Sequence, residues 1–381
     1  MRARGGRSSP VTSPMSTEST VALAQWQHED STQALRELLS RTHQEFRAHI
    51  QQTSSHEIGP LQFRVESNDS KAHTLLTRCL LSAPEFLSPA EPDQTQAPAF
   101  TLSLWTADAA PHRHPPQWNL PHTDARHVER LHLSPDGQFS AYFDFDRGFW
   151  LMLDKTTKHA MVWLPSLDAM PFWEEAAPFK QIIQWWMDGS AMTLLHGGVV
   201  TDGRHGILLT GPGGSGKSTT VAACLQAGLG VCGDDLIAVE RLQTGWLAHS
   251  AYDAVKLCDS STIPAPPVLA NAPSSPCGDK KLVRYSDTAN NGQVRSTPLN
   301  ALVHCVISGG PVSRLTPLAP AALLMALGPS TAFMLRGRES HILTRAGQLV
   351  RSLPCFRLAL GQDPMQAATL VQEWIESLNH V

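Results

Sequence analysis

Charged residues are scarce in this 381-residue chain. Asp, Glu, Lys and Arg together make up 17% of it and leave a formal net charge of -4, whereas a typical soluble domain is about 25% charged. A small net charge of acidic sign gives no basic surface of the kind with which proteins bind nucleic acids. We therefore expect no nucleic-acid partner.

Long hydrophobic runs are missing as well. No apolar segment approaches the roughly 18 to 20 residues that span a bilayer, and one of the longest, 318–328, is interrupted by Pro320. Residues 1–20 are rich in Arg and Ser and contain no apolar segment typical of a secretory signal. We expect 1–20 to be a disordered tail, with Met15 as an alternative start, and we expect no membrane partner.

Cysteine is limited to seven scattered residues, an odd number, and no two of them form a CxxC pair. This pattern supports neither a disulfide framework nor a zinc site. It favours a reducing compartment, and we expect a cytoplasmic protein.

Hydrophobic residues nevertheless make up 42% of the chain, enough to bury a core, and the length suggests two domains. Residues 21–190 are predicted to form an α+β domain of unassigned role, with a largely antiparallel sheet. Its expected helices cover 21–50 and 177–195, a Pro/His-rich loop is expected at 107–123, and alternating apolar residues predict strands at 61–65, 100–104, 139–145, 148–153 and 160–164.

Residues 191–381 change character and predict an α/β domain. Buried strands are expected at 206–210, 229–232, 236–241, 245–249, 254–257, 301–307 and 355–360, with helices at 217–227, 340–351 and 364–378. The Pro- and Ser-rich segment 260–276 is expected to form a long loop near the active face.

A glycine-rich motif carries the strongest chemical signal. The sequence Gly-Pro-Gly-Gly-Ser-Gly-Lys-Ser-Thr at 211–219 matches GxxxxGK[ST] between a predicted strand and a predicted helix. Glycines let backbone N–H groups converge on phosphates, Lys217 supplies a charge for the β- and γ-phosphates, and the Ser218 hydroxyl can ligate Mg²⁺. We expect ATP and Mg²⁺ as cofactors, with the nucleotide bound by Gly211, Gly213, Gly214, Ser215, Gly216, Lys217, Ser218 and Thr219.

Two further signals flank this motif. Asp234 and Asp235 close the strand after the expected helix, and adjacent carboxylates at a strand end point in different directions. One can hold a metal while the other faces a hydroxyl substrate; the alternative is a simple turn cap. His196 lies fifteen positions before Gly211. A single histidine there is usually structural, but the three signals together favour a catalytic site.

The segments 196–200, 206–218 and 230–235 resemble the core of the HPr serine kinase/phosphorylase family. The resemblance implies a P-loop kinase core with a mixed sheet, like that of ATP-dependent phosphoenolpyruvate carboxykinases. It also implies that Asp234 assists the metal, that Asp235 accepts the proton of a substrate serine and that His196 orients this site. The homo-oligomer of the family is implied too, although the surfaces that would form it are not recognisable.

This chain departs from the family in two places. The Glu-Ile-Arg-Gly-Leu-Gly type segment is absent, and Asp253 or Lys256 is the candidate to replace it, with strand packing as the alternative. The N-terminal part is unlike that of true HPr kinases, so the chain is most similar to HPr-kinase-related proteins. The charged segments 279–281 and 336–338 are candidates for contacts with phosphate or an acidic peptide, but solvated basic turns are the expected alternative.

The sequence therefore predicts an ATP- and Mg²⁺-dependent kinase for a hydroxyl group, a serine of a protein or peptide, with Asp235, His196 and Lys217 as catalytic residues. Ser218 and Asp234 are the predicted metal ligands. Two alternatives stay open: a carboxykinase-like or small-molecule kinase on the same core, and a non-catalytic nucleotide-binding regulator.

Overall fold

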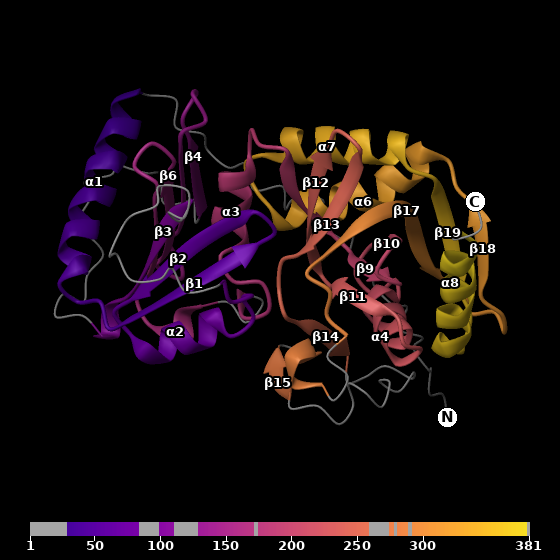
Figure 1. Ribbon diagram of the computed structural model, residues 1–381. Helices are drawn as coiled ribbons and strands as arrows, with labels where there is room; N and C mark the ends of the chain where they lie inside the picture. The colour runs from indigo at the N-terminus through magenta and orange to yellow at the C-terminus, as the bar shows by residue number, and fades with distance from the viewer. Residues whose placement is uncertain are drawn as a thin grey trace, which may run out of the picture.

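Two mixed β-sheets with helices packed against them organise the chain (Figure 1). The computed structural model describes residues 29–83, 99–109, 129–170, 174–258, 274–277, 280–288 and 292–378. The predicted tail 1–20, most of the Pro/His-rich segment, most of the predicted loop 260–276 and Asp279 lie outside these residues.

The first sheet contains seven strands within the described part of the N-terminal half. Its spatial order is β1 (Gln52–Ile58), β2 (Leu61–Ser67), β3 (Phe100–Thr106), β7 (His159–Leu164), β6 (Phe149–Asp154), β5 (Phe139–Asp144) and β4 (Glu129–Leu133). Four of the pairings are antiparallel, but β3 runs parallel to both β2 and β7. The sheet is therefore largely antiparallel, as predicted, but it is mixed, because β3 lies between two strands that run in its own direction.

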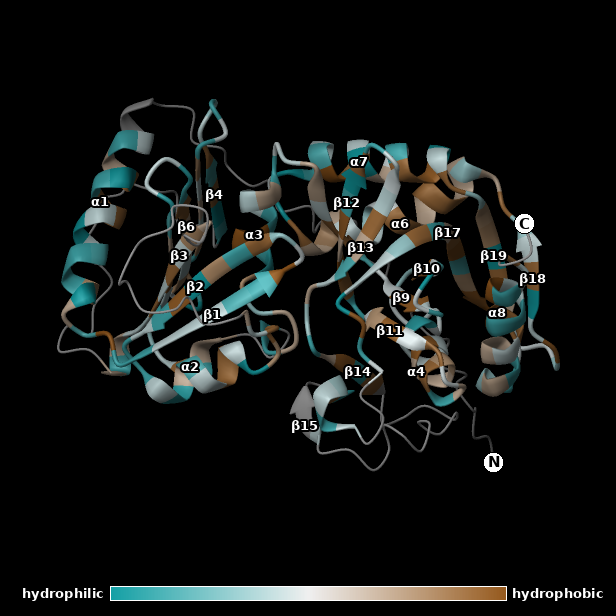
Figure 2. Ribbon diagram, viewed as in Figure 1, coloured by the Kyte–Doolittle hydropathy of each residue, from teal (hydrophilic) through white to brown (hydrophobic). Residues whose placement is uncertain are grey.

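Helices cover both faces of this first sheet. Strand residues alternate between faces, and along β6 the side chains of Trp150 and Met152 pack in the cluster under α1 (Glu29–Arg47). Leu151 and Leu153 point the other way, into a larger core that includes residues of α2 (Ser70–Thr77) and α3 (Lys180–Met187). Figure 2 shows the corresponding pattern, with hydrophilic residues along α1 and hydrophobic residues on β3 and β6 to its right.

The second sheet contains nine strands among the described residues of the C-terminal half. Its main path is β11 (Gly230–Gly233), β9 (Gly198–Thr201), β10 (Gly206–Thr210), β17 (Ser296–Ile307), β13 (Gly245–Ser250), β12 (Leu236–Leu242) and β8 (Met192–His196). Strand β19 (Cys355–Leu360) pairs in parallel with β17 and carries β18 (Arg314–Pro317) at its other edge.

The helices of this half lie on opposite faces of the second sheet. Leu208 of β10 packs in the core with residues of α6 (Pro320–Met334) and α7 (Glu339–Ser352), whereas Ile207 and Leu209 face residues of α4 (Lys217–Gln226) and α8 (Pro364–Leu378). A strand whose consecutive residues are apolar is typically buried on both faces. The sequence of 206–210 therefore predicts this arrangement for β10. The architecture is a mixed α/β fold.

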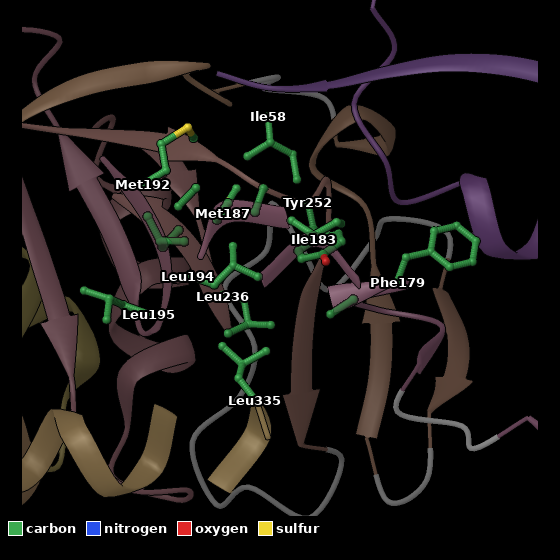
Figure 3. Close-up of a cluster of buried hydrophobic side chains, with 14 of the residues drawn as sticks. Ile58, Phe179, Ile183, Met187, Met192, Leu194, Leu195, Leu236, Tyr252 and Leu335 are labelled. Atoms are coloured by element: carbon green, nitrogen blue, oxygen red, sulfur yellow. The ribbon is translucent and has the colours of Figure 1, made fainter. Parts of the chain in front are cut away.

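One hydrophobic core joins the two halves. Figure 3 shows part of it: Ile183 and Met187 of α3 lie in one cluster with Leu194 of β8 and Leu236 of β12. Ile58 from the first sheet belongs to the same cluster. The predicted boundary at 190/191 falls between α3 and β8, and the division into domains stays a prediction.

A small antiparallel sheet lies below the second sheet in Figure 1. Its strands are β14 (Val255–Cys258), β16 (Lys280–Val283) and β15 (Ser274–Cys277), in that order. The predicted loop 260–276 thus ends in a strand instead of running unstructured to Pro276.

One helix prediction needs correction, and two helices of the structure, α2 and α6, were not predicted. The expected helix 177–195 covers only Lys180–Met187, because Gly189 (φ +82°) turns the chain and Met192 already begins β8. Helix α6 was not predicted at all. It is apolar on several sides and contains Pro329, so its sequence shows neither the amphipathic pattern nor the freedom from internal proline that identifies a helix.

Candidate functional site

The glycine-rich loop leads directly from the buried strand β10 into α4. Gly211 (φ +145°) and Gly216 (φ +93°) adopt backbone conformations that side chains rarely allow. At Gly216 a Cβ would also lie 2.4 Å from Leu360 Cδ1. These two glycines fix the bend that brings the loop back to the first turn of α4, where backbone N–H groups lack helical partners.

The middle of the loop borders an open space. A Cβ added to Gly213 or Gly214 would meet no atom within 4 Å, although Gly214 has a φ of +78°. The space is a cavity of about 410 Å³ lined by residues 213–220, together with His196, Asp235, Lys256, Leu257, Lys280, Ile307, Leu360, Gly361 and Pro364. The loop backbone thus faces a pocket large enough for a small organic ligand.

Lys217 projects its charge into the curve of this loop. Its side chain is buried, and Nζ donates hydrogen bonds to the carbonyl oxygens of Gly211 (2.7 Å) and Pro212 (3.0 Å). Burial lowers the pKa of the Lys217 ammonium, and the nearby Asp234 carboxylate opposes that shift. Among the described residues, the hydrogen bonds of this ammonium go to backbone carbonyls, and an anion in the cavity can replace them.

Asp234 and Asp235 occupy a tight turn after β11. The Leu236 N–H donates to the Asp234 carbonyl (2.9 Å), and Asp235 has a φ of +70°. Asp234 points inward and is buried, and neither of its carboxylate oxygens has a hydrogen-bond partner among the described residues. Burial raises the pKa of Asp234 to about 6 and Asp235 adds to the shift, whereas the Ser218 hydroxyl, which is nearby but outside hydrogen-bond geometry, opposes it. Gly198 makes room for this carboxylate, because a Cβ there would lie 3.1 Å from Asp234 Oδ1.

Asp235 points the opposite way, toward two basic side chains. Lys256 Nζ lies 2.6 Å from Asp235 Oδ2, and His196 Nε2 lies 3.7 Å from Asp235 Oδ1. Burial opposes the charged form, but the Lys256 ammonium and then His196 hold the pKa of Asp235 below its usual value. Asp235 is therefore ionised at neutral pH.

His196 reaches this place because β8 pairs with β12, the strand that follows the aspartate turn. Leu236 is opposite His196 in that pairing, and the Gly197 N–H donates to the Asp235 carbonyl (3.2 Å). The His196 N–H donates to the hydroxyl of Thr331 on α6 (2.9 Å). Burial, followed by the Lys217 charge, lowers the pKa of His196 to about 4. The ring is neutral at pH 7, and 3.7 Å is too long for a hydrogen bond to Asp235.

The structure thus brings His196, Lys217, Ser218, Asp234 and Asp235 into one neighbourhood around the loop. The sequence had offered Asp253 or Lys256 as a substitute for the missing family segment, and the two behave differently. Asp253 accepts hydrogen bonds from the N–H and hydroxyl of Ser286, away from the cavity. Lys256 pairs with Asp235. The apolar residues beside Lys256 in its strand could not predict that partner.

The remaining charged candidates, Lys280, Arg336 and Arg338, have different surroundings. Lys280 lines the loop cavity. Arg336 pairs with Glu129, and Arg338 lies 3.1 Å from Asp188. The expected solvated basic turn at 336–338 is therefore wrong, because acidic residues from the first half of the fold and from the end of α3 meet both guanidinium groups.

A second cavity, of about 500 Å³, lies against the first. Asp235 and Lys256 line both of them. The rest of its wall comes from the first sheet and its β5–β6 turn, from α3 and the segment before it, and from the end of α6 with Arg336. This cavity could not be predicted from the sequence, since its walls come from segments far apart in the chain.

The residues around Asp234 fit a magnesium ion held together with nucleotide phosphates. Among the described residues no group of three or more His, Cys, Asp or Glu side chains could hold a metal by itself. Mg²⁺ in nucleotide sites takes only one or two protein ligands and fills the remainder with phosphate oxygens and water. The unpartnered oxygens of Asp234 beside Ser218 satisfy that requirement.

Comparisons with known proteins add little to this geometry. No family model and no curated protein matches the chain. Among solved structures, the Hpr(Ser) kinase/phosphatase from Coxiella burnetii is similar, with 13% identity and a TM-score of 0.29. That match covers 49% of this chain and 99% of the other, and so low a TM-score carries no argument. Within the described residues, no helix combines the length and apolar character needed to cross a membrane.

Proposed function

We propose that this protein is an ATP- and Mg²⁺-dependent kinase that transfers the γ-phosphoryl group to a hydroxyl group, a serine of a protein or peptide. The observation that carries the proposal is the position of Asp235. This ionised carboxylate lies on the wall shared by the cavity at the glycine-rich loop and a second cavity. A group at that boundary can face a donor on one side and an acceptor on the other.

The loop cavity suits the nucleotide phosphates. Backbone N–H groups of residues 213–217 and the N-terminus of α4 favour anions, and Gly213 and Gly214 leave space for close approach. Lys217 exchanges its backbone carbonyl contacts for phosphate oxygens, and Gly211 and Gly216 hold the loop in shape. Ser215 and Thr219 line the same cavity.

Ser218 and Asp234 are the groups that would hold Mg²⁺, which when bound neutralises charge on the β- and γ-phosphates. Two buried carboxylate oxygens without partners are costly unless a cation or a proton compensates them. The raised pKa of Asp234, about 6, reflects that cost. A cation at this position supplies the missing partner.

Asp235 serves as the acceptor of the hydroxyl proton. A carboxylate with a lowered pKa is a weak base, but phosphoryl transfer depends mainly on positioning and electrostatics, so modest basicity suffices. Lys256 holds the Asp235 carboxylate in place and ionised. The His196 ring lies beside this carboxylate, with Nε2 3.7 Å from Oδ1, and it is neutral at pH 7, so it can orient the site without forming an ion pair.

The experiment follows ADP release and transfer of label from ATP carrying a labelled γ-phosphate, with and without Mg²⁺. We expect Mg²⁺-dependent nucleotide binding that Lys217→Ala weakens at least about 100-fold, since the lysine is the principal charge on the phosphates. Lys71→Ala, an exposed lysine of α2, is the matched control and leaves binding unchanged. Equal nucleotide affinity in wild type and Lys217→Ala would contradict the proposal, and binding without any phosphoryl transfer or hydrolysis would favour a regulator.

A further inference from the structure

The second cavity lies where the two halves of the fold meet, and its walls come from both. The first sheet, the region of α3 and the end of α6 line it, and Asp235 and Lys256 stand on the side of the glycine-rich loop. At about 500 Å³ it has the size of pockets that bind small organic molecules, which span about 300 to 1,000 Å³. A folded protein cannot enter it, but one or two amino-acid residues can.

Hydrogen bonds and an ion pair within the protein hold the walls of this cavity together. The Gln181 side chain on α3 donates to the Arg336 carbonyl (2.7 Å) and accepts from the Arg336 N–H (2.9 Å). The indole of Trp185 donates to the same carbonyl (3.3 Å), and the Arg336 guanidinium pairs with Glu129 of β4. The cavity is therefore preformed, which lowers the entropic cost of binding.

Every charged side chain in the wall has a partner of opposite sign in the wall. The four pairs are Glu129 with Arg336, Asp144 with Arg147, Glu174 with Lys180, and Asp235 with Lys256. The lining thus contains equal numbers of acidic and basic groups. A ligand with a net charge would have to break one of these pairs or remain unpaired, and either change is unfavourable.

The remaining surface is largely apolar. Phe149 and Leu151 of β6, Ala177, and Met334 contribute hydrophobic atoms, and Phe333 near the end of α6 is 82% exposed. An exposed phenylalanine at the edge of a pocket gains free energy when a ligand covers it. Such a wall binds a hydrophobic group beside the reacting hydroxyl.

From this geometry we infer that the second cavity binds the phosphate acceptor, and that the acceptor is a hydroxyl group, such as that of serine, next to an uncharged apolar group. The inference rests on the proposed function and names the acceptor class for that site. The hydroxyl oxygen lies toward Asp235 and attacks the γ-phosphorus. The new O–P bond forms as the bond to the β,γ-bridging oxygen breaks, ADP leaves with that electron pair, and Asp235 takes the hydroxyl proton.

The test uses three capped dipeptides with the purified full chain, ATP and Mg²⁺: N-acetyl-leucyl-serinamide and its aspartyl and lysyl counterparts. We expect the leucyl compound to be phosphorylated with a KM about tenfold lower than either charged one, because the charged side chains find no free partner. A ten-residue peptide with Leu-Ser at its centre identifies the source of the hydroxyl. If it is a substrate, the acceptor is a peptide segment, and if only the dipeptide reacts, it is a free small molecule.

Two variants of α6 connect the result to the cavity. Phe333→Ala should raise the KM for the leucyl dipeptide about tenfold, equivalent to about 1.4 kcal/mol, without a matching rise in the KM for ATP. Met325→Ala removes another exposed side chain of the same helix, one that is 73% exposed and outside both cavities, and should change neither constant.

Binding of the leucyl dipeptide without nucleotide, followed by saturation-transfer NMR, separates this inference from the proposed function. If the dipeptide binds, and Phe333→Ala weakens binding, while ATP does not bind, the cavity assignment holds and the kinase proposal fails. If ATP binds and is hydrolysed but the three dipeptides bind equally or not at all, or Phe333→Ala has no effect, the acceptor inference is overturned.

Discussion

The two cavities that share Asp235 are built in contrasting ways. The cavity at the glycine-rich loop takes about half of its lining from one continuous segment, 213–220, between β10 and α4. The second cavity takes its lining from β4, β5, β6, α3, β14 and α6, and from the turns and segments that adjoin them and β11. A site that depends on one short backbone segment can be recognised from the local sequence. A pocket shaped by tertiary packing cannot.

Substitution of Lys256 tests how the two cavities are coupled, because Lys256 lines both and its Nζ lies 2.6 Å from Asp235 Oδ2. We expect Lys256→Met to lower kcat about 10- to 100-fold while the nucleotide affinity changes far less, since the loop that holds the phosphates is intact. Steady-state kinetics and nucleotide titration measure the two effects. Lys256→Arg, which keeps the charge, should recover part of kcat. A purely structural lysine would instead give equal losses in both variants, together with a lower melting temperature.

Substitution of Gly213 tests the cavity at the glycine-rich loop by itself. A Cβ at this position meets no protein atom, and its φ lies outside the left-handed region. Gly213→Ala should therefore leave the melting temperature unchanged but weaken ATP binding about tenfold, since the methyl group occupies space that the phosphates need. Gly310→Ala is the control, because its Cβ would make only an ordinary 3.5 Å contact with Ser308 Oγ. Unchanged ATP affinity in Gly213→Ala would show that the phosphates do not approach this part of the loop.

His56 allows a test of the pH dependence of stability that involves neither cavity. It is buried on β1, with Nε2 2.6 Å from Ser54 Oγ, and burial lowers its pKa from 6.5 to about 4. Protonation therefore favours the unfolded chain. As the pH falls from 6.5 to about 4, this group should reduce the free energy of unfolding by about 1.4 kcal/mol per pH unit.

Denaturant unfolding at several pH values measures this effect as the difference between wild type and His56→Gln. We expect the variant to depend less steeply on pH in that range, with little change in ATP affinity at neutral pH. Parallel pH profiles for the two proteins would contradict the assignment.

The predicted strand and helix on either side of the glycine-rich loop are confirmed, while nucleotide binding there stays a prediction. A buried strand, glycines at positions of positive φ and a helix start are all local, so 206–217 could be interpreted without knowledge of the fold. The closeness of His196 and Asp235 depends on the pairing of β8 with β12. The spacing of these residues does not by itself predict that pairing. The family resemblance was what suggested it.

The second cavity could not be predicted, because its walls depend on how the two sheets pack. The pairing of Glu129 with Arg336 and the hydrogen bonds from Gln181 to the backbone of Arg336 join residues 155 to 207 positions apart. The unpredicted α6 supplies Phe333 and Met334. Lys256 was one of two candidates that the sequence could not separate. Only the turn that directs Asp253 to Ser286 and Lys256 to Asp235 distinguishes them.

The position of Asp235 between the two cavities is tested most directly by Asp235→Asn. Nucleotide affinity and the rate of phosphoryl transfer to the leucyl dipeptide should be measured on the same preparation. We predict that ATP affinity stays within about threefold of wild type, because the phosphate-binding loop is untouched, while transfer falls about 10²- to 10⁴-fold, the range expected for loss of a general base. Transfer at the wild-type rate in Asp235→Asn, with Lys217→Ala inactive, would contradict the assignment of Asp235 as the residue that joins nucleotide and acceptor.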